Sequence, residues 1–162
     1  MSSEVFTIER QISAMADRWP QLVLATREGA SATWRGPLRP LLQTFQVEIT
    51  FRAPSIIEKL NNRRMQPRVK ILTPQLRPRR GDPEGQLPHV YYIGCGPLDV
   101  VLCMFDPDSD EWSPFMSVAE TTVPWAIDWL TSYEGWRATG TWTGTGKHIE
   151  QPRAALGSAV NR

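Results

Sequence analysis

The stretch Phe45-Gln46-Val47-Glu48-Ile49-Thr50-Phe51 decides the fold. Its apolar residues alternate strictly with polar ones, and this period of two predicts a β-strand with one buried face and one solvated face. Pro54 ends the pattern. Three further strands are predicted around it, at residues 21–27, 32–38 and 67–72. The connections between the first three strands are too short for a crossover helix, so we expect an antiparallel meander.

A helix is predicted before these strands. Apolar residues recur there at three- and four-residue steps, which is typical of an amphipathic helix; they are Val5, Ile8, Ile12, Met15 and Trp19. Ser3 is the expected N-cap, and Pro20 ends the pattern. Between the third and fourth strands, residues 56–64 form either one or two helical turns or only a loop.

The chain after the sheet divides into a loop and a helical part. Residues 73–88 are rich in proline and glycine, and residues 87–110 are predicted to be mostly irregular, with Val100-Val101-Leu102 as a short extended segment. Ser113-Pro114 has the chemistry of a helix start, with serine as N-cap and proline in the first turn. We therefore expect a short helix at residues 116–122.

A second C-terminal helix is predicted to follow. Thr122 is its expected cap, and Gly140 ends it. Helical spacing relates its apolar and basic residues, which are Ala126, Trp129, Leu130, Tyr133 and Arg137. The whole order predicts an α+β fold in which helices are segregated from one antiparallel sheet.

Composition narrows the class of protein. The 162 residues fit a single domain, expected at residues 1–150 with a flexible tail at 151–162. A net charge of +1 argues against a nucleic-acid binder driven by bulk charge. No apolar run approaches the ~18 residues of a membrane helix, and the polar start Met-Ser-Ser-Glu does not resemble a signal peptide. We therefore expect a cytoplasmic protein that binds neither nucleic acid nor membrane.

The chain has two cysteines, Cys95 and Cys103. Two are too few for a disulfide scaffold or a cysteine zinc site, and in a reducing compartment both should be free thiols. No metal or cofactor is expected. Five of the seven tryptophans lie between Trp112 and Trp142, so we expect a densely packed C-terminal third with tryptophans in its core.

Three short motifs surround Cys103 in a fixed order. They are His89-Val90-Tyr91, Leu102-Cys103-Met104 and Trp112-Ser113-Pro114. Their order, after a sheet and before helices, resembles the ubiquitin-conjugating enzymes, whose nucleophilic cysteine follows a His-Pro-Asn and precedes a Trp-Ser-Pro. The resemblance implies a ubiquitin-conjugating-enzyme-like fold with a cysteine-bearing loop, and it implies that Cys103 is the nucleophile.

A longer series of motifs resembles a narrower family, the conjugating-enzyme-like proteins of bacterial antiphage operons. It comprises Pro88-His89-Val90-Tyr91, Leu102-Cys103-Met104-Phe105-Asp106-Pro107, Glu111-Trp112, Pro124-Trp125, Trp129-Leu130, Tyr133-Glu134-Gly135-Trp136 and residues 140–148. The resemblance implies the conjugating component of a cyclic-oligonucleotide-based antiphage signalling system (CBASS). It also implies a thioester between Cys103 and the C-terminus of a cGAS-like nucleotidyltransferase. An activating enzyme or a ubiquitin-like modifier stands open as a further partner.

The resemblance suggests roles for Tyr91 and His89, and the residues themselves suggest roles for Asp106 and His148. Tyr91 stands where the family has an asparagine that stabilises the oxyanion, so the donor here must be a backbone amide, a hydroxyl or a different side chain. His89 is expected to support the loop by hydrogen bonds. Asp106 opens an acidic run that either orients or deprotonates an incoming amine or forms a solvated loop. His148 is expected to be structural or exposed.

Several alternatives remain open from the residues alone. Cys103 can be a small buried thiol, in which case the protein is a non-catalytic conjugating-enzyme variant that only binds a partner. A cysteine hydrolase lacks a histidine and an acid at recognisable spacing. Cys95 is expected to be a buried thiol, or else a resolving thiol for Cys103. Basic residues form either a surface for an acidic partner or a solvated face; they are Arg63, Arg64, Arg68, Lys70, Arg77, Arg79 and Arg80.

Overall fold

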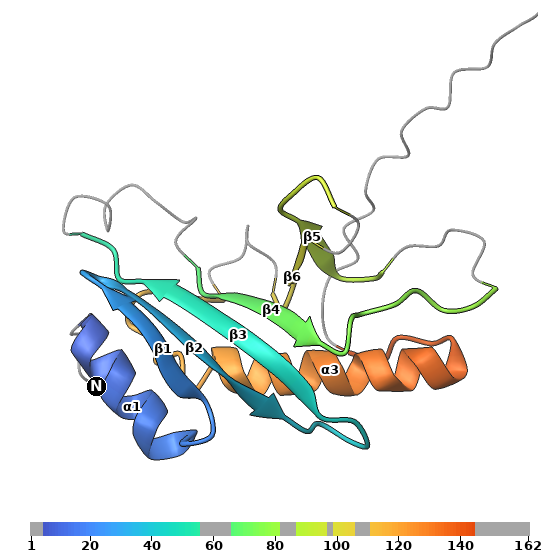
Figure 1. Cartoon of the computed structure of the whole chain (residues 1–162), viewed down its shortest axis with the longest axis horizontal. Helices are drawn as coiled ribbons and strands as arrows, with labels where there is room; N and C mark the ends of the chain where they lie inside the picture. Colours follow the sequence, from blue (N-terminus) through green and yellow to red (C-terminus); the bar gives the residue numbers. More distant parts are fainter. Residues whose placement is uncertain (1–4, 56–65, 82–86, 97–98, 106–110, 145–162) are drawn as a thin grey trace, which may run out of the picture.

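The computed structural model describes residues 5–55, 66–81, 87–96, 99–105 and 111–144. The elements run in the order α1 (Ile8–Arg18), β1 (Val23–Glu28), β2 (Ser31–Leu38), β3 (Phe45–Arg52), β4 (Arg68–Thr73), β5 (Val90–Tyr92), β6 (Val100–Leu102) and α3 (Thr122–Thr139). Strands β1 to β4 form one antiparallel sheet in sequence order, and β5 pairs with β6 in a separate hairpin (Figure 1). The predicted α+β class, N-terminal helix, four-stranded antiparallel meander and C-terminal helix are confirmed.

Strand β3 supplies the centre of the core, as its alternation predicts. Phe45, Val47, Ile49 and Phe51 are all buried, whereas the residues between them face outward. Helix α3 runs along the same face of the sheet (Figure 1), and the edge of the Tyr133 ring contacts Phe45. The hydrophobic core therefore lies between the sheet and α3.

Strand β1 forms the edge of the sheet and is exposed along its whole length, although Leu22 just before it is buried. The chain before β1 approaches β2 closely at Gly36. A Cβ atom at Gly36 would lie 2.0 Å from the backbone oxygen of Gln21. Glycine is therefore required there by a backbone contact.

Helix α1 begins later than its apolar spacing predicts. Thr7 is the N-cap, and its hydroxyl accepts a hydrogen bond from the amide of Arg10. The predicted cap, Ser3, was therefore wrong, because the described residues before Ile8 are not helical. The face that α1 buries includes one polar side chain, Gln11, which is fully buried.

The short helix predicted at residues 116–122 is absent, and turns occupy residues 114–116 and 118–121. The reason lies in contacts with α1 and the residue that follows it. The Gln11 side chain donates to the Met116 carbonyl at 3.0 Å and accepts from the Val118 amide at 2.8 Å, and the Trp19 indole donates to the Ala119 carbonyl at 2.7 Å. These long-range contacts therefore hold the backbone of this segment in turns against α1 and Trp19.

The described residues after these turns contain one helix, α3. Its N-cap is Thr121 rather than Thr122, and it ends at Gly140 as predicted, in the left-handed conformation with φ of 83°. Trp129 and Trp136 are buried, and Trp125 and Trp142 are half-buried against the core. The tryptophans of this region therefore belong to the core, as expected.

Some predictions fall on residues that the structure does not describe. The helical or loop character of residues 56–64 and the flexible tail at 151–162 remain predictions, as does the domain boundary near residue 150. Among the described residues no helix is both long and apolar enough to cross a membrane.

Candidate active site

The β5–β6 hairpin positions Cys103. Val90 pairs with Leu102, Tyr91 with Val101, and Tyr92 with Val100. Sequence reasoning anticipated the extended segment at β6 but missed β5, although Val90-Tyr91-Tyr92 has the β-branched and aromatic residues that strands favour. Strand β6 lies beside β4 (Figure 1), so the hairpin is fixed next to the sheet.

Cys103 follows β6 directly and extends the backbone hydrogen bonding of the hairpin by one residue. Its amide donates a hydrogen bond to the carbonyl of His89 at 2.9 Å. The indole of Trp129 donates to the same carbonyl at 2.8 Å. The His89 carbonyl oxygen therefore accepts two hydrogen bonds. One comes from the candidate nucleophile, and the other comes from helix α3.

His89 has a left-handed backbone conformation with φ of 51°, which is uncommon outside glycine. Its imidazole packs against the Trp142 ring, with 4.9 Å between the ring centroids. Both features, together with the carbonyl contacts, fit the supporting role expected of His89. The carbonyl contribution carries no sequence signal, because any residue type has that oxygen.

The side chains of Tyr91 and Cys103 meet across the hairpin. The Cys103 thiol donates to the Tyr91 hydroxyl, with 3.0 Å between Sγ and Oη, and Sγ also lies 3.5 Å from the Phe105 carbonyl oxygen. Tyr91 pairs with Val101, and Cys103 lies two residues beyond Val101 on the same face of its strand. The contact is therefore a diagonal cross-strand pair, which is within the reach of an aromatic side chain.

The two thiols have different environments. Cys103 is buried, with 7% of its surface exposed. Cys95 is exposed in the turn between the two strands, so the expectation of a buried Cys95 was wrong. The reason is that Asp99 closes this turn, accepting from the Gly96 amide through its carboxylate, while the Ile93 amide donates to the Asp99 carbonyl. The two cysteines thus lie at opposite ends of the hairpin.

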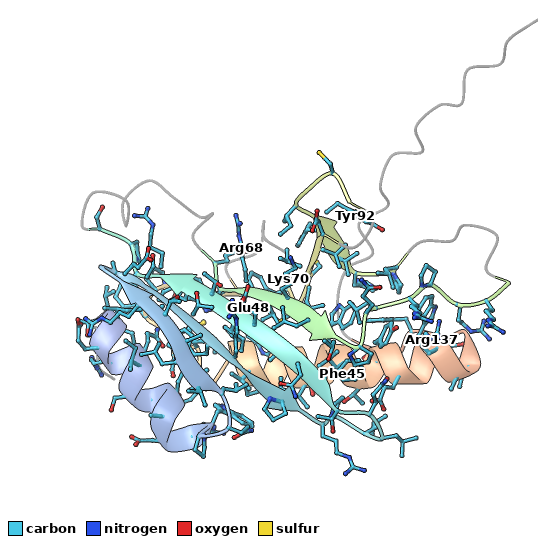
Figure 2. All side chains as sticks on the ribbon, in the orientation of Figure 1. Phe45, Glu48, Arg68, Lys70, Tyr92 and Arg137 are labelled. Atoms are coloured by element: carbon cyan, nitrogen blue, oxygen red, sulfur yellow. The ribbon has the colours of Figure 1, made fainter. Side chains whose placement is uncertain are left out.

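The remaining candidate residues are only partly described. Asp106 and His148 lie outside the described residues, as do Arg63 and Arg64. Lys70 lies 3.8 Å from the Asp99 carboxylate on the outer face of the sheet, where Figure 2 labels it beside Arg68. Arg79 donates to the Arg137 carbonyl. In the described part of the chain, no three His, Cys, Asp or Glu side chains gather as metal ligands would.

Comparison with known proteins identifies the family. No curated protein matches the chain. A family model described as the type II CBASS E2 protein matches residues 11–149, a range that contains the whole sheet, the hairpin with Cys103, and α3. The resemblance inferred from the motifs is confirmed, and the chain belongs to the type II CBASS E2 protein family.

Proposed function

We propose that this protein is a conjugating enzyme that holds the C-terminal acyl group of a protein partner as a thioester on Cys103. The observation that carries the proposal is the thiol itself. It lies at the base of a hairpin, in contact with a side-chain hydroxyl, in a chain of the CBASS E2 family. The proposal includes a ubiquitin-conjugating-enzyme-like fold. The order along the chain, with an antiparallel sheet after an N-terminal helix and before a C-terminal helix, supports this part of the proposal.

The reaction is transthioesterification followed by transfer. The Cys103 thiolate attacks the carbonyl carbon of an activated C-terminus, a carbon–sulfur bond forms, and the leaving thiolate takes up the proton that Cys103 lost. The acyl group then passes to an amine or a hydroxyl. A free C-terminal carboxylate needs prior activation, so an activating enzyme, with or without a ubiquitin-like modifier, stays open as a further partner of this reaction.

The proposed partner is a cGAS-like nucleotidyltransferase, whose regulation would link the thioester to antiphage signalling. The family match and the resemblance of the motifs support this choice. His89 is the proposed supporting residue, because its carbonyl and ring make the contacts described above. Asp106 keeps its proposed role with an incoming amine. We expect the reaction to occur in the cytoplasm, where thiols stay reduced.

The test is adduct formation in a Cys95→Ser background, which leaves Cys103 as the only thiol. The protein is mixed with the nucleotidyltransferase and an activating enzyme and analysed on non-reducing gels. We expect a covalent adduct that dithiothreitol cleaves and that Cys103→Ala abolishes. Cys103→Ser should give an ester that resists dithiothreitol. An adduct that persists after Cys103→Ala would rule out the assignment.

A second candidate function is a non-catalytic protein-binding module. The burial of Cys103 favours it, because a buried thiol is often structurally inert. Alkylation with iodoacetamide distinguishes the two functions in the same Cys95→Ser background. A thiol that reacts in the folded protein favours the transferase. A thiol that reacts only after denaturation, in a protein that still binds the nucleotidyltransferase, favours the binding module.

A further inference from the structure

We propose that Tyr91 is a catalytic residue whose phenolic hydroxyl donates a hydrogen bond to the oxyanion that forms when Cys103 attacks an acyl group. This inference rests on the proposed acyl transfer at Cys103. It assigns to a tyrosine the role that an asparagine has in the ubiquitin-conjugating enzymes that the chain resembles. The argument depends on the position of the hydroxyl, on the lack of a competing amide at the nucleophile, and on the neighbouring Tyr92.

The hydroxyl already lies at the reacting atom. Oη of Tyr91 is 3.0 Å from Sγ of Cys103, and the strand pairing of Tyr91 with Val101 holds it on the same face. When Sγ bonds to an acyl carbon, the acyl oxygen lies only two bonds from Sγ. A hydroxyl in contact with the sulfur is therefore within hydrogen-bonding reach of that oxygen.

The acyl transfer requires only a hydrogen-bond donor at this position, which stabilises the negative charge on the acyl oxygen. As the carbon–sulfur bond forms, the carbonyl π electrons move onto oxygen, and the Tyr91 O–H stabilises that negative charge without giving up its proton. The carbonyl then reforms and the bond to the leaving thiolate breaks. Before attack, the same O–H can donate a hydrogen bond to the Cys103 thiolate. During attack it donates instead to the oxyanion, so one hydroxyl stabilises the negative charge on sulfur and then on oxygen.

The backbone amide of the nucleophile does not compete for this role. In many acyl-transfer enzymes the N–H of the nucleophilic residue itself faces the oxyanion. Here the Cys103 N–H donates to the His89 carbonyl at 2.9 Å. A left-handed His89 backbone and a hydrogen bond from Trp129 hold that carbonyl in place. The Tyr91 hydroxyl, by contrast, is a donor that the hairpin brings to Sγ.

Tyr92 provides a matched control. It is the next residue on the same strand, so its side chain points to the opposite face of the hairpin, and 43% of its surface is exposed. Figure 2 shows Tyr92 on the outside of the hairpin. Tyr91→Phe and Tyr92→Phe each remove a single oxygen, and only the first change removes it from Cys103.

The experiment compares two reactions of the same thiol in the full chain with Cys95→Ser. Iodoacetamide alkylates a thiolate by displacement at carbon and forms no oxyanion. A glycine-ended peptide thioester of 2-mercaptoethanesulfonate acylates the thiolate through an oxyanion. We expect Tyr91→Phe to slow acylation by about 10²-fold, the typical loss for one oxyanion donor, and to slow alkylation by less than ~10-fold. Tyr92→Phe should change neither rate.

A second variant makes the test independent of packing. Tyr91→His retains an aromatic ring with an N–H donor, and we expect it to recover part of the acylation rate that Tyr91→Phe loses. Circular dichroism establishes that each variant is folded. The inference is overturned if Tyr91→Phe slows both reactions by the same factor, if it slows neither, or if Tyr91→His loses as much acylation as Tyr91→Phe.

These outcomes separate the role of Tyr91 from the proposed function. Cys103 that accepts the peptide thioester in a Tyr91-dependent way, but never forms an adduct with a nucleotidyltransferase, would sink the partner assignment and leave Tyr91 catalytic. A Cys103-dependent protein adduct that forms equally fast in Tyr91→Phe would sink the Tyr91 role alone. Cys103 that reacts with neither reagent in the folded protein would sink both.

Discussion

The indole nitrogen of Trp129 donates a hydrogen bond to the backbone carbonyl of His89, with 2.8 Å between the two atoms. The same oxygen accepts the amide of Cys103. Because Trp129 lies on α3, the helix and the hairpin meet at a single acceptor immediately beside the proposed nucleophile. Through the His89 carbonyl, Trp129 on α3 is therefore hydrogen-bonded to the same backbone oxygen as Cys103.

Replacing Trp129 with phenylalanine should weaken this connection. The change keeps an aromatic ring but removes the donor, so we expect a loss of about 1–2 kcal/mol in the free energy of unfolding and slower acylation of Cys103. Urea unfolding and the peptide thioester reaction measure the two effects. Trp136→Phe is the control, since Trp136 lies on the same helix as Trp129 and its ring packs against Tyr133 and Trp142. A larger loss of acylation in the control would contradict the role of the indole.

Gln11 offers a test of the contacts between α1 and the turns that precede α3. Gln11→Ala removes a buried amide and leaves the Val118 N–H and the Met116 carbonyl without that partner. We expect it to destabilise the protein by about 1–3 kcal/mol in urea unfolding. Gln46→Ala, on the exposed face of β3, should stay within about 0.5 kcal/mol of the unaltered protein. Equal effects of the two variants would show that the Gln11 contacts contribute little.

Two glycines should respond to alanine in opposite directions. Gly36→Ala forces a methyl group against the Gln21 carbonyl, and we expect it to lower the unfolding free energy by about 1–3 kcal/mol. Gly135 lies within α3 with open space around its Cβ position, so Gly135→Ala should raise the free energy by about 0.5–1 kcal/mol. Thermal unfolding of both variants measures the signs. A neutral Gly36→Ala would show that the strands can move apart.

Glu9 gives a pH dependence with a definite sign. A hydrogen bond from its own backbone amide, then the Thr7 hydroxyl and Arg27, lower the pKa of the Glu9 carboxyl below its usual value of 4.5. Because the folded pKa is the lower one, this carboxylate stabilises the protein above pH 4.5, and the contribution is lost as pH falls through the folded pKa. Glu9→Gln should therefore lower the unfolding temperature at pH 7 and not at pH 2. A difference that persists at pH 2 would contradict this assignment.

Much of the fold could be predicted from the sequence because its signals are long and local. Seven alternating residues predict β3, and the motifs around Cys103 predict the candidate site. Strand β5 was missed because three residues are too few for a period of two to be recognised. The helix expected at residues 116–122 failed because Gln11 and Trp19 bind backbone groups of that segment, and contacts so distant in sequence leave no local pattern.

The contact between Tyr91 and Cys103 could not be predicted for a related reason. The sequence shows a tyrosine in place of an asparagine, but it does not show which strand Tyr91 pairs with or which face it occupies. Both depend on the alignment of β5 with β6. The prediction that a hydroxyl could replace the asparagine was therefore one alternative among several, and the hairpin geometry now favours it.

The proposed chemistry at the hairpin depends on the register of β5 against β6, but it does not depend on the length of the connection between them. Changing the number of residues between Tyr92 and Val100 alters the turn alone, so a natural or engineered insertion there can leave the Sγ–Oη contact intact. A slip of β5 by one residue against β6 would instead turn Tyr91 to the solvent side and bring Tyr92 toward Cys103. A slip in the opposite direction would place Val90 on that face and leave it without a phenol, so the direction of the slip decides whether a hydroxyl reaches Cys103.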